Sequence, residues 1–218
     1  MPHSALDGVT PHSVLDHGIR YFRRRRMSRF ERQFHITEST TILDVGGTDY
    51  NWSMLTVQPR VTLLNLPQSL VEERFQSIPG DGCFLPFRDQ SFDIVFSNSV
   101  IEHVGAPEIQ AQFAREIIRV GRRYWVQTPD RSFPVEPHLF TPFLHYMPRN
   151  LQAGVARRFT VWNWMTRPSP ERRDWYIQHY LESIRLLSAE DMRRLFPGGK
   201  IIRERLLGKS RSLVAAKY

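Results

Sequence analysis

The stretch Gly80–Val104 constrains this chain more than any other part of it. It has the sequence GDGCFLPFRDQSFDIVFSNSVIEHV. It begins with an acidic residue between two glycines, which is followed by a Leu-Pro-Phe segment and a turn at Asp89–Ser91. The apolar run Phe92–Phe96 comes next. A short apolar run bounded by turn signals is typical of a buried parallel strand. The stretch therefore predicts an acidic loop, a strand and a polar strand end that leads to Glu102 and His103.

Further apolar runs alternate with helical patterns along the chain. Strands are expected at Thr41–Val45, Val61–Asn65, Phe75–Ile78, Asp93–Phe96 and Tyr124–Gln127. A helix is expected over Pro107–Val120, where Ile109, Phe113, Ile117 and Val120 share one face. This alternation predicts an α/β fold, a doubly wound and mostly parallel sheet with helices on both sides.

An arginine-rich helix is predicted ahead of the first strand. Apolar residues recur between His12 and His35 at helical spacings, which places them on one face: Leu15, Ile19, Phe22, Phe30 and Phe34. Seven arginines lie around this face and supply much of the net charge of +8: Arg20, Arg23, Arg24, Arg25, Arg26, Arg29 and Arg32. The cluster is either a solvated surface or a site that attracts an anionic membrane or a phosphate-bearing substrate.

The C-terminal part predicts a closing hairpin. Ser188 is expected to cap a short helix, and Lys200–Leu207 and Ser212–Lys217 are expected to pair around a turn at Gly208. Residues 140–187, rich in aromatic residues and prolines, are left as an insertion. We therefore expect a basic helix in residues 1–38, a core in 39–139 and 188–218, and a helical, aromatic lid or substrate insertion in 140–187.

Length and composition exclude several classes of protein. A chain of 218 residues fits one α/β domain with a modest addition. It has no apolar run long enough to span a membrane, and Met1–Gly18 contains His, Asp and Pro where a signal peptide needs an apolar centre. The single cysteine, Cys83, excludes an internal disulfide and a metal site built from cysteines. These features predict a cytoplasmic protein.

The segment Gly80–Val104 resembles the middle of class I S-adenosylmethionine-dependent methyltransferases of the small bacterial type. In that family a GDA-x-x-LPF-x-D-x-SFD-x-V-x-S pattern and a following EHV recur, and this chain repeats the pattern in the same order. The resemblance implies a Rossmann-like seven-stranded sheet that ends in an antiparallel hairpin. It also implies S-adenosylmethionine as the cofactor and S-adenosylhomocysteine as the product.

The resemblance also assigns roles at the first two strand ends. The loop that starts at Asp44 and Gly46 is expected to approach the methionine part of the cofactor. Thr48 and Tyr50 occupy the two other positions where the family has glycine. Asn65 stands where the family has an acidic residue for the ribose hydroxyls, and its amide can still accept one hydrogen bond and donate another.

The same resemblance assigns roles at the next strand ends. It places the Asp81 carboxylate on the adenine amino group and the Gly82 backbone at the edge of the ring. Asn98 and Ser99 match the floor beneath the methionine and the sulfonium. Each of these residues has a plain structural alternative, because Asp beside glycine forms turns, and Asn and Ser cap helices.

Two histidines follow strand ends where an acceptor would bind. His103 comes after the Asp93–Phe96 strand, and His138 comes after the Tyr124–Gln127 strand. A hydroxyl acceptor needs a base, so either histidine is a candidate catalytic residue, with backbone bonding as the structural alternative. Glu102 and His103 can also contribute to a divalent metal site, as in the resembling quinone O-methyltransferases. Ser99 replaces a further acidic ligand of those enzymes, so we expect no metal.

The sequence favours methyl transfer to an oxygen of a small molecule, a sugar or a lipid-linked intermediate. The alternative is a catalytically silent relative that binds a partner or nucleic acid through its basic helix. A nicotinamide oxidoreductase would need a G-x-G-x-x-G turn, which Gly46-Gly47-Thr48 does not supply. Nucleic acid is disfavoured as a substrate, because Asn98-Ser99 is not of the Pro-Pro-Tyr type found in amino-methylating enzymes. The acceptor and the oligomeric state stay open.

Overall fold

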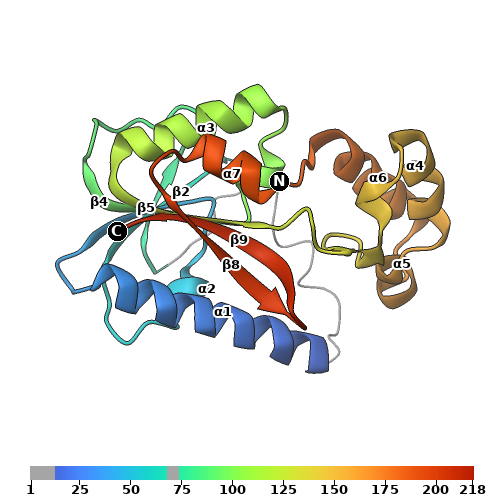
Figure 1. Cartoon of the computed structure of the whole chain (residues 1–218), viewed down its shortest axis with the longest axis horizontal. Coiled ribbons are helices and arrows are strands. Elements are labelled where there is room, and N and C mark those ends of the chain that lie inside the picture. Colours follow the sequence, from blue (N-terminus) through green and yellow to red (C-terminus); the bar gives the residue numbers. More distant parts are fainter. Residues whose placement is uncertain (1–12, 68–73) are drawn as a thin grey trace. The chain divides into compact units, whose positions relative to one another are not determined.

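The computed structural model describes residues 13–67 and 74–218 (Figure 1). Their contacts group into two compact units. The first contains the described residues up to Asn98, with Gln112–Val126 and Ala216–Tyr218, and the second contains Ser99–Ala111 and Gln127–Ala215. Most of the Met1–Gly18 stretch, from which we predicted the location, lies outside the described residues. Within the described ranges, no helix combines the length and apolarity needed to cross a bilayer.

Among the described residues, seven strands form one sheet in the order β3-β2-β1-β4-β5-β9-β8. The strands are β1 (Thr41–Val45), β2 (Arg60–Asn65), β3 (Gln76–Pro79), β4 (Phe92–Asn98), β5 (Gly121–Pro129), β8 (Lys200–Leu206) and β9 (Lys209–Lys217). β1 pairs in parallel with β2 and with β4, and β2 pairs in parallel with β3. The strand order reverses between β1 and β4, which is where doubly wound sheets bind ligands. The predicted fold is confirmed.

The helices follow the predicted order and add three in the insertion. They are α1 (Ser13–Phe34), α2 (Asp49–Trp52), α3 (Pro107–Val120), α4 (Arg149–Arg158), α5 (Val161–Thr166), α6 (Pro170–Ser183) and α7 (Ala189–Leu195), with single turns η3 (Ile101–His103) and η4 (Leu144–Tyr146). A two-stranded ribbon pairs β6 (Val135–Glu136) with β7 (Thr141–Pro142). Ser188 caps α7 as predicted, in a capping box with Asp191.

Aromatic side chains build the core of the first unit. The Phe30 ring of α1 contacts the rings of Phe34, Trp52, Phe96 and Trp125, with centroids 5.0 to 6.2 Å apart. Figure 1 shows α1 and the main part of α3 on opposite faces of the strands. The apolar face of α1 thus packs on the domain, while Leu15 and Ile19 lie outside the described side chains.

The predicted buried face of α3 is wrong at Ile109. Ile109 is 43% exposed, whereas the neighbouring Gln110 is only 6% exposed. The Gln110 amide donates to the backbone carbonyls of Ile101 and Arg185, at 3.1 Å each. A buried carbonyl needs a hydrogen-bond donor. The polar side chain of Gln110 is therefore buried on the face where the apolar pattern predicted Ile109.

A separate core holds the insertion together in the second unit. Buried residues from its helices and from the loop before them form this core: Leu139, Leu144, Ala156, Trp162, Ile177, Tyr180 and Ile184. The indole of Trp162 stacks on Tyr176 with ring centroids 4.5 Å apart. In contrast, Trp164 is 77% exposed and Trp175 is 47% exposed. The predicted aromatic insertion therefore has a core of its own, and it also presents aromatic rings to solvent.

Candidate active site

The loop after β1 is shaped by two glycines. Gly46 has φ +79°, in the left-handed region that favours glycine, and its N–H donates to the Leu64 carbonyl at 2.8 Å. A Cβ on Gly47 would lie 1.8 Å from Oδ2 of Asp44. That oxygen also accepts a hydrogen bond from the Trp52 indole at 2.9 Å. Gly47 is therefore required for the loop to pass over the buried Asp44 carboxylate, a role that we did not assign from the sequence.

Asn65 at the end of β2 is tied to the same loop. Its amide nitrogen donates to the Gly47 carbonyl at 3.0 Å. This bond fixes the orientation of the amide, so that Oδ1 is the atom left to accept a bond from a ligand hydroxyl. An aspartate at this position could not make the bond to Gly47, which is a structural reason for the amide.

The acidic loop forms a tight turn next to β1. Oδ1 of the exposed Asp81 accepts the Cys83 N–H at 2.8 Å, and the Asp81 carbonyl accepts the Phe84 N–H at 3.0 Å. A Cβ on Gly82 would lie 2.6 Å from the Phe113 ring and 2.9 Å from Val45. Asp81 thus has the turn-forming role that was the structural alternative, while its second carboxylate oxygen remains for a ligand.

Cys83 in this loop is a structural residue. Burial, followed by the nearby Asp81 carboxylate, raises the pKa of its thiol to about 12. The thiol therefore stays neutral near pH 7, and a neutral thiol is neither a nucleophile nor a metal ligand.

Two arginines of α1 contact residues of the predicted cofactor site. Arg26 is only 7% exposed and donates from its guanidinium to Oδ1 of Asn98 at the end of β4. The guanidinium carbon of Arg23 lies 5.3 Å from the centre of the Tyr50 ring in α2, the helix that follows the β1 loop. Burial, and then the charge of Arg26, lower the pKa of Arg23.

These contacts show that the arginine cluster contains both exposed and buried members. Sequence analysis treated the cluster as one basic surface, whereas Arg20, Arg24 and Arg25 are exposed and Arg26 is buried. A signal for this was present, since position 26 lies four residues after Phe22 and four before Phe30, on the apolar face. Arg26 therefore belongs with the residues at the end of β4.

Ser99 begins the second unit in a conformation unusual for serine. Its φ is +58°, and its hydroxyl donates to the Gln127 side chain at 2.9 Å. Its N–H donates to the Gln127 carbonyl at 3.0 Å. A non-glycine residue in the left-handed region costs about 1 to 3 kcal/mol, so the contacts with Gln127 must hold Ser99 in this conformation.

The two predicted histidines lie against each other. The Nε2 atoms of His103 and His138 are 3.3 Å apart, and the rings meet edge to face with centroids separated by 5.0 Å. Nδ1 of His138 lies 2.6 Å from Oε1 of Glu136, whose side chain is fully buried. The other oxygen of Glu136 accepts the Leu139 N–H at 2.6 Å. Glu136 is therefore a site residue that sequence analysis did not identify.

The hydrogen bonds assign the proton positions in this pair. The Glu136 carboxylate accepts from His138, so Nδ1 of His138 carries the proton and its Nε2 presents a lone pair. Nε2 of His103 then donates to that lone pair. His103 is the more accessible ring, with 30% of its side chain exposed against 14% for His138. A neutral histidine pair with a carboxylate behind it can take up one proton.

Buried groups from β5 and the insertion surround this pair. Oε2 of the fully buried Glu102 accepts the Thr128 hydroxyl at 3.0 Å. The Tyr176 hydroxyl donates to the His138 carbonyl at 3.3 Å. Burial, with a smaller contribution from Glu136, raises the pKa of Tyr176 to about 12, and the same causes raise the pKa of Tyr180. Both phenols therefore stay protonated and neutral.

Three donor atoms converge at this place. One ligand atom each from Glu102, His103 and His138 lies within 4.8 Å of the others. Two imidazoles and a carboxylate suit a divalent transition metal. A metal would bind only after the proton shared by the two Nε2 atoms had left. Glu102, His103 and His138 can therefore act either as a proton acceptor or as the ligands of a cation.

Comparison with known proteins supports a methyltransferase domain in part of the chain. Residues 37–123 match the family model described as a methyltransferase domain. An uncharacterized protein of Mycobacterium tuberculosis is 29% identical over 98 residues, which cover 38% of this chain and 33% of that protein. The chain thus spans about a third of the length of the curated relatives that it matches.

Solved structures share the fold at low sequence identity. One is titled a putative Zn-dependent alcohol dehydrogenase from Rhodobacter sphaeroides, with a TM-score of 0.58, 14% identity, and coverage of 88% of this chain and 87% of that one. Another is magnesium protoporphyrin IX methyltransferase from Synechocystis PCC 6803, with a TM-score of 0.55, 12% identity, and coverage of 97% and 90%. At such identities the likeness shows the fold alone.

Proposed function

We propose that the chain transfers a methyl group from S-adenosylmethionine to a hydroxyl oxygen, because residues 37–123 match the model of a methyltransferase domain. The acceptor is a small molecule, a sugar or a lipid-linked intermediate. The observation that carries the choice of a hydroxyl is the buried Glu136 carboxylate, 2.6 Å from Nδ1 of His138. A hydroxyl is a poor nucleophile until it loses its proton, and this arrangement prepares a base.

The cofactor in this proposal is S-adenosylmethionine, with S-adenosylhomocysteine as the product. Asp81 accepts from the adenine amino group and Gly82 borders the ring, while Oδ1 of Asn65 accepts from a ribose hydroxyl. Asp44, Gly46 and Gly47 shape the loop next to the methionine part. The site residues Asn98 and Ser99 mark the end of β4, where the sulfonium is expected.

Methyl transfer is an in-line displacement. The acceptor oxygen forms a bond to the methyl carbon while the bond from sulfur to that carbon breaks. The sulfur leaves as a neutral thioether, so no general acid is required. The proton of the hydroxyl passes to the pair His103–His138, and the positive charge then lies on His138 beside Glu136. The mechanism needs no metal.

Cofactor binding tests the proposal. We expect calorimetry with S-adenosylhomocysteine to show one site, and labelled methyl groups from S-adenosylmethionine to appear on a hydroxyl acceptor. A folded protein that binds neither compound would favour the alternative, a silent relative. That alternative is motivated by Thr48 and Tyr50, which replace glycines of the family pattern.

The exposed arginines of α1 suggest where the enzyme meets its acceptor. We propose that Arg20, Arg24 and Arg25 attract an anionic membrane or a phosphate-bearing substrate, whereas Arg23 and Arg26 belong to the cofactor site. Each basic residue near an anionic membrane contributes about 1 kcal/mol of binding free energy. This attraction weakens within about 8 to 10 Å at physiological salt.

Replacing two of these arginines tests the membrane part. We expect the double variant Arg24→Gln/Arg25→Gln to bind vesicles that contain phosphatidylserine roughly thirtyfold more weakly, measured by co-sedimentation at low salt. The matched control is Arg203→Gln/Arg205→Gln on β8, which removes the same charge from exposed positions. Equal binding by both variants, or no binding of the wild type to anionic vesicles and phosphorylated ligands at low salt, would show that these arginines are only a solvated face.

A further inference from the structure

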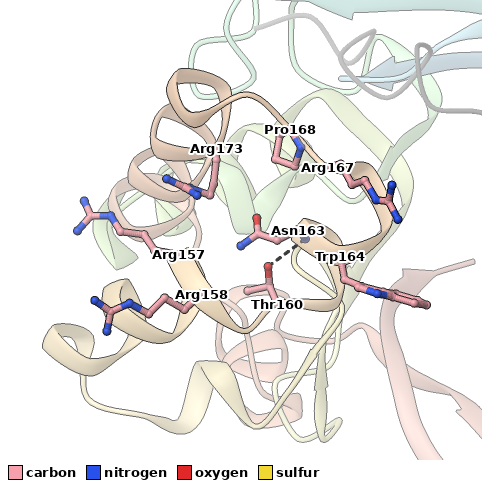
Figure 2. Close-up of a pocket in the computed structure, with 8 residues that line it drawn as sticks. All are labelled: Arg157, Arg158, Thr160, Asn163, Trp164, Arg167, Pro168 and Arg173. Atoms are coloured by element: carbon pink, nitrogen blue, oxygen red, sulfur yellow. Dashed lines mark hydrogen bonds between the residues drawn. The ribbon is translucent and has the colours of Figure 1, made fainter.

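The helical insertion contains a pocket that the proposed reaction does not use. It has a volume of about 340 Å³ and is lined by residues from the end of α4 to the start of α6: Arg157, Arg158, Thr160, Asn163, Trp164, Arg167, Pro168 and Arg173 (Figure 2). We call it the arginine pocket. All of these residues belong to the second unit.

The lining of the arginine pocket is strongly basic. It includes four arginines and no carboxylate. Asp174, outside the lining, lies 3.6 Å from Nε of Arg157 and 3.5 Å from Nε of Arg173. Within the described chain, Arg158 and Arg167 make no ion pair that offsets their charge. One carboxylate against four guanidinium groups leaves the pocket with a positive potential that attracts an anion.

Two polar atoms in the pocket wall also lack hydrogen-bond partners. The Asn163 amide nitrogen donates to the Ala156 carbonyl at 2.8 Å, which fixes the side chain and leaves Oδ1 as an acceptor. Among the described residues, neither this buried Oδ1 nor the buried Nε of Arg173 has a hydrogen-bond partner. The Asn163 oxygen is costly to bury alone, and Nε of Arg173 has its ion-pair partner Asp174 at 3.5 Å, beyond good hydrogen-bond distance. A ligand that donates to the first atom and accepts from the second would therefore be favoured.

The positions of these side chains suggest a ligand with two kinds of group. In Figure 2, Arg157, Arg158 and Arg173 extend to one side of Asn163, and Arg167 and Trp164 extend to the other. Guanidinium groups bind phosphate oxygens in a bidentate manner. A hydroxyl close to the phosphate would donate to Oδ1 of Asn163.

We propose that the arginine pocket binds a phosphate-bearing small molecule with a hydroxyl next to the phosphate, such as a phosphorylated sugar. The phosphate lies among Arg157, Arg158 and Arg173, and the hydroxyl bonds to Asn163. The proposal uses none of the residues assigned to the cofactor and does not depend on methyl transfer.

Calorimetry with glucose 1-phosphate, without any cofactor and at constant ionic strength, tests the proposal. We expect wild-type protein to bind glucose 1-phosphate, to bind inorganic phosphate more weakly, and not to bind glucose. Loss of a charged hydrogen-bond donor should raise the Kd for glucose 1-phosphate about tenfold or more in Arg158→Gln and in Arg173→Gln. The matched control is Arg193→Gln, an exposed arginine of α7 in the same unit, which should change the Kd less than about twofold.

Three outcomes would overturn the assignment. They are no binding of glucose 1-phosphate by folded wild-type protein at low salt, an equal Kd for the three variants, and binding of inorganic phosphate as tight as that of the ester. The second outcome would indicate a general effect of net charge, and the third would indicate an anion site without a role for Asn163. Folding of each variant is checked by its thermal melting curve.

Discussion

Replacement of His138 by alanine is expected to lower turnover by about 10² to 10⁴ while the affinity for S-adenosylhomocysteine stays close to that of the wild type. The reason is geometric, because Nδ1 of His138 lies 2.6 Å from the buried Glu136 and its Nε2 presents the lone pair. The His103→Ala variant tests the other member of the pair. Single-turnover kinetics with a hydroxyl acceptor, together with calorimetry, separate the loss of chemistry from the loss of binding.

The Glu136→Gln variant tests whether the carboxylate behind His138 contributes to turnover. It removes the negative charge behind His138 and keeps a side chain of nearly the same shape, so turnover should fall. His35→Ala is the control, because this exposed histidine follows α1 and has no predicted role in the pair. Near-full turnover by both His103→Ala and His138→Ala would show that positioning alone carries the reaction.

Replacement of Asp81 by asparagine is expected to weaken the binding of S-adenosylhomocysteine roughly ten- to a hundredfold, because a hydrogen bond from the adenine amino group to a charged carboxylate contributes about 1.5 to 3 kcal/mol. Asparagine keeps an oxygen for the Cys83 N–H, which Asp81 accepts at 2.8 Å. The substitution therefore spares the turn and removes only the second carboxylate oxygen. Calorimetry on the folded variant measures the change.

Two further variants make the Asp81 result interpretable. Asp81→Ala also removes the turn bond, so it should bind no more tightly than Asp81→Asn and should melt at a lower temperature. Asp89→Asn is the control, since this exposed carboxylate pairs with Arg119 at 2.9 Å and has no predicted role with the cofactor. Equal affinity of wild type, Asp81→Asn and Asp89→Asn would place the adenine elsewhere.

The sequence determined most of the sheet and its helices, because their signals are local. The buried runs that form β1 and β4, the helix Pro107–Val120 and the Ser188 cap all appear where the pattern predicted them. Burial of a continuous apolar segment needs no knowledge of its partner. The family pattern in Gly80–Val104 similarly predicted a methyltransferase domain, and residues 37–123 match the model of one.

The sequence also predicted part of the candidate site, because it showed which polar residues follow the ends of the strands. Parallel strands bring their carboxyl ends to one edge, so His103 and His138 were expected near an acceptor although 35 positions separate them. The sequence could not show that their Nε2 atoms meet, or that Glu136 supports one of them. Those facts depend on the loop between β5 and β6 and on rotamers that packing selects.

Only the tertiary structure decided which polar residues are buried. Arg26 and Arg24 are the same residue type on one helix, yet Arg26 reaches Asn98 from the apolar face and Arg24 is exposed. Gln110 replaces Ile109 in the interior because two backbone carbonyls need its amide. Periodicity predicts the face that is buried, but the hydrogen bonds that polar groups require inside it are set by neighbours distant in sequence.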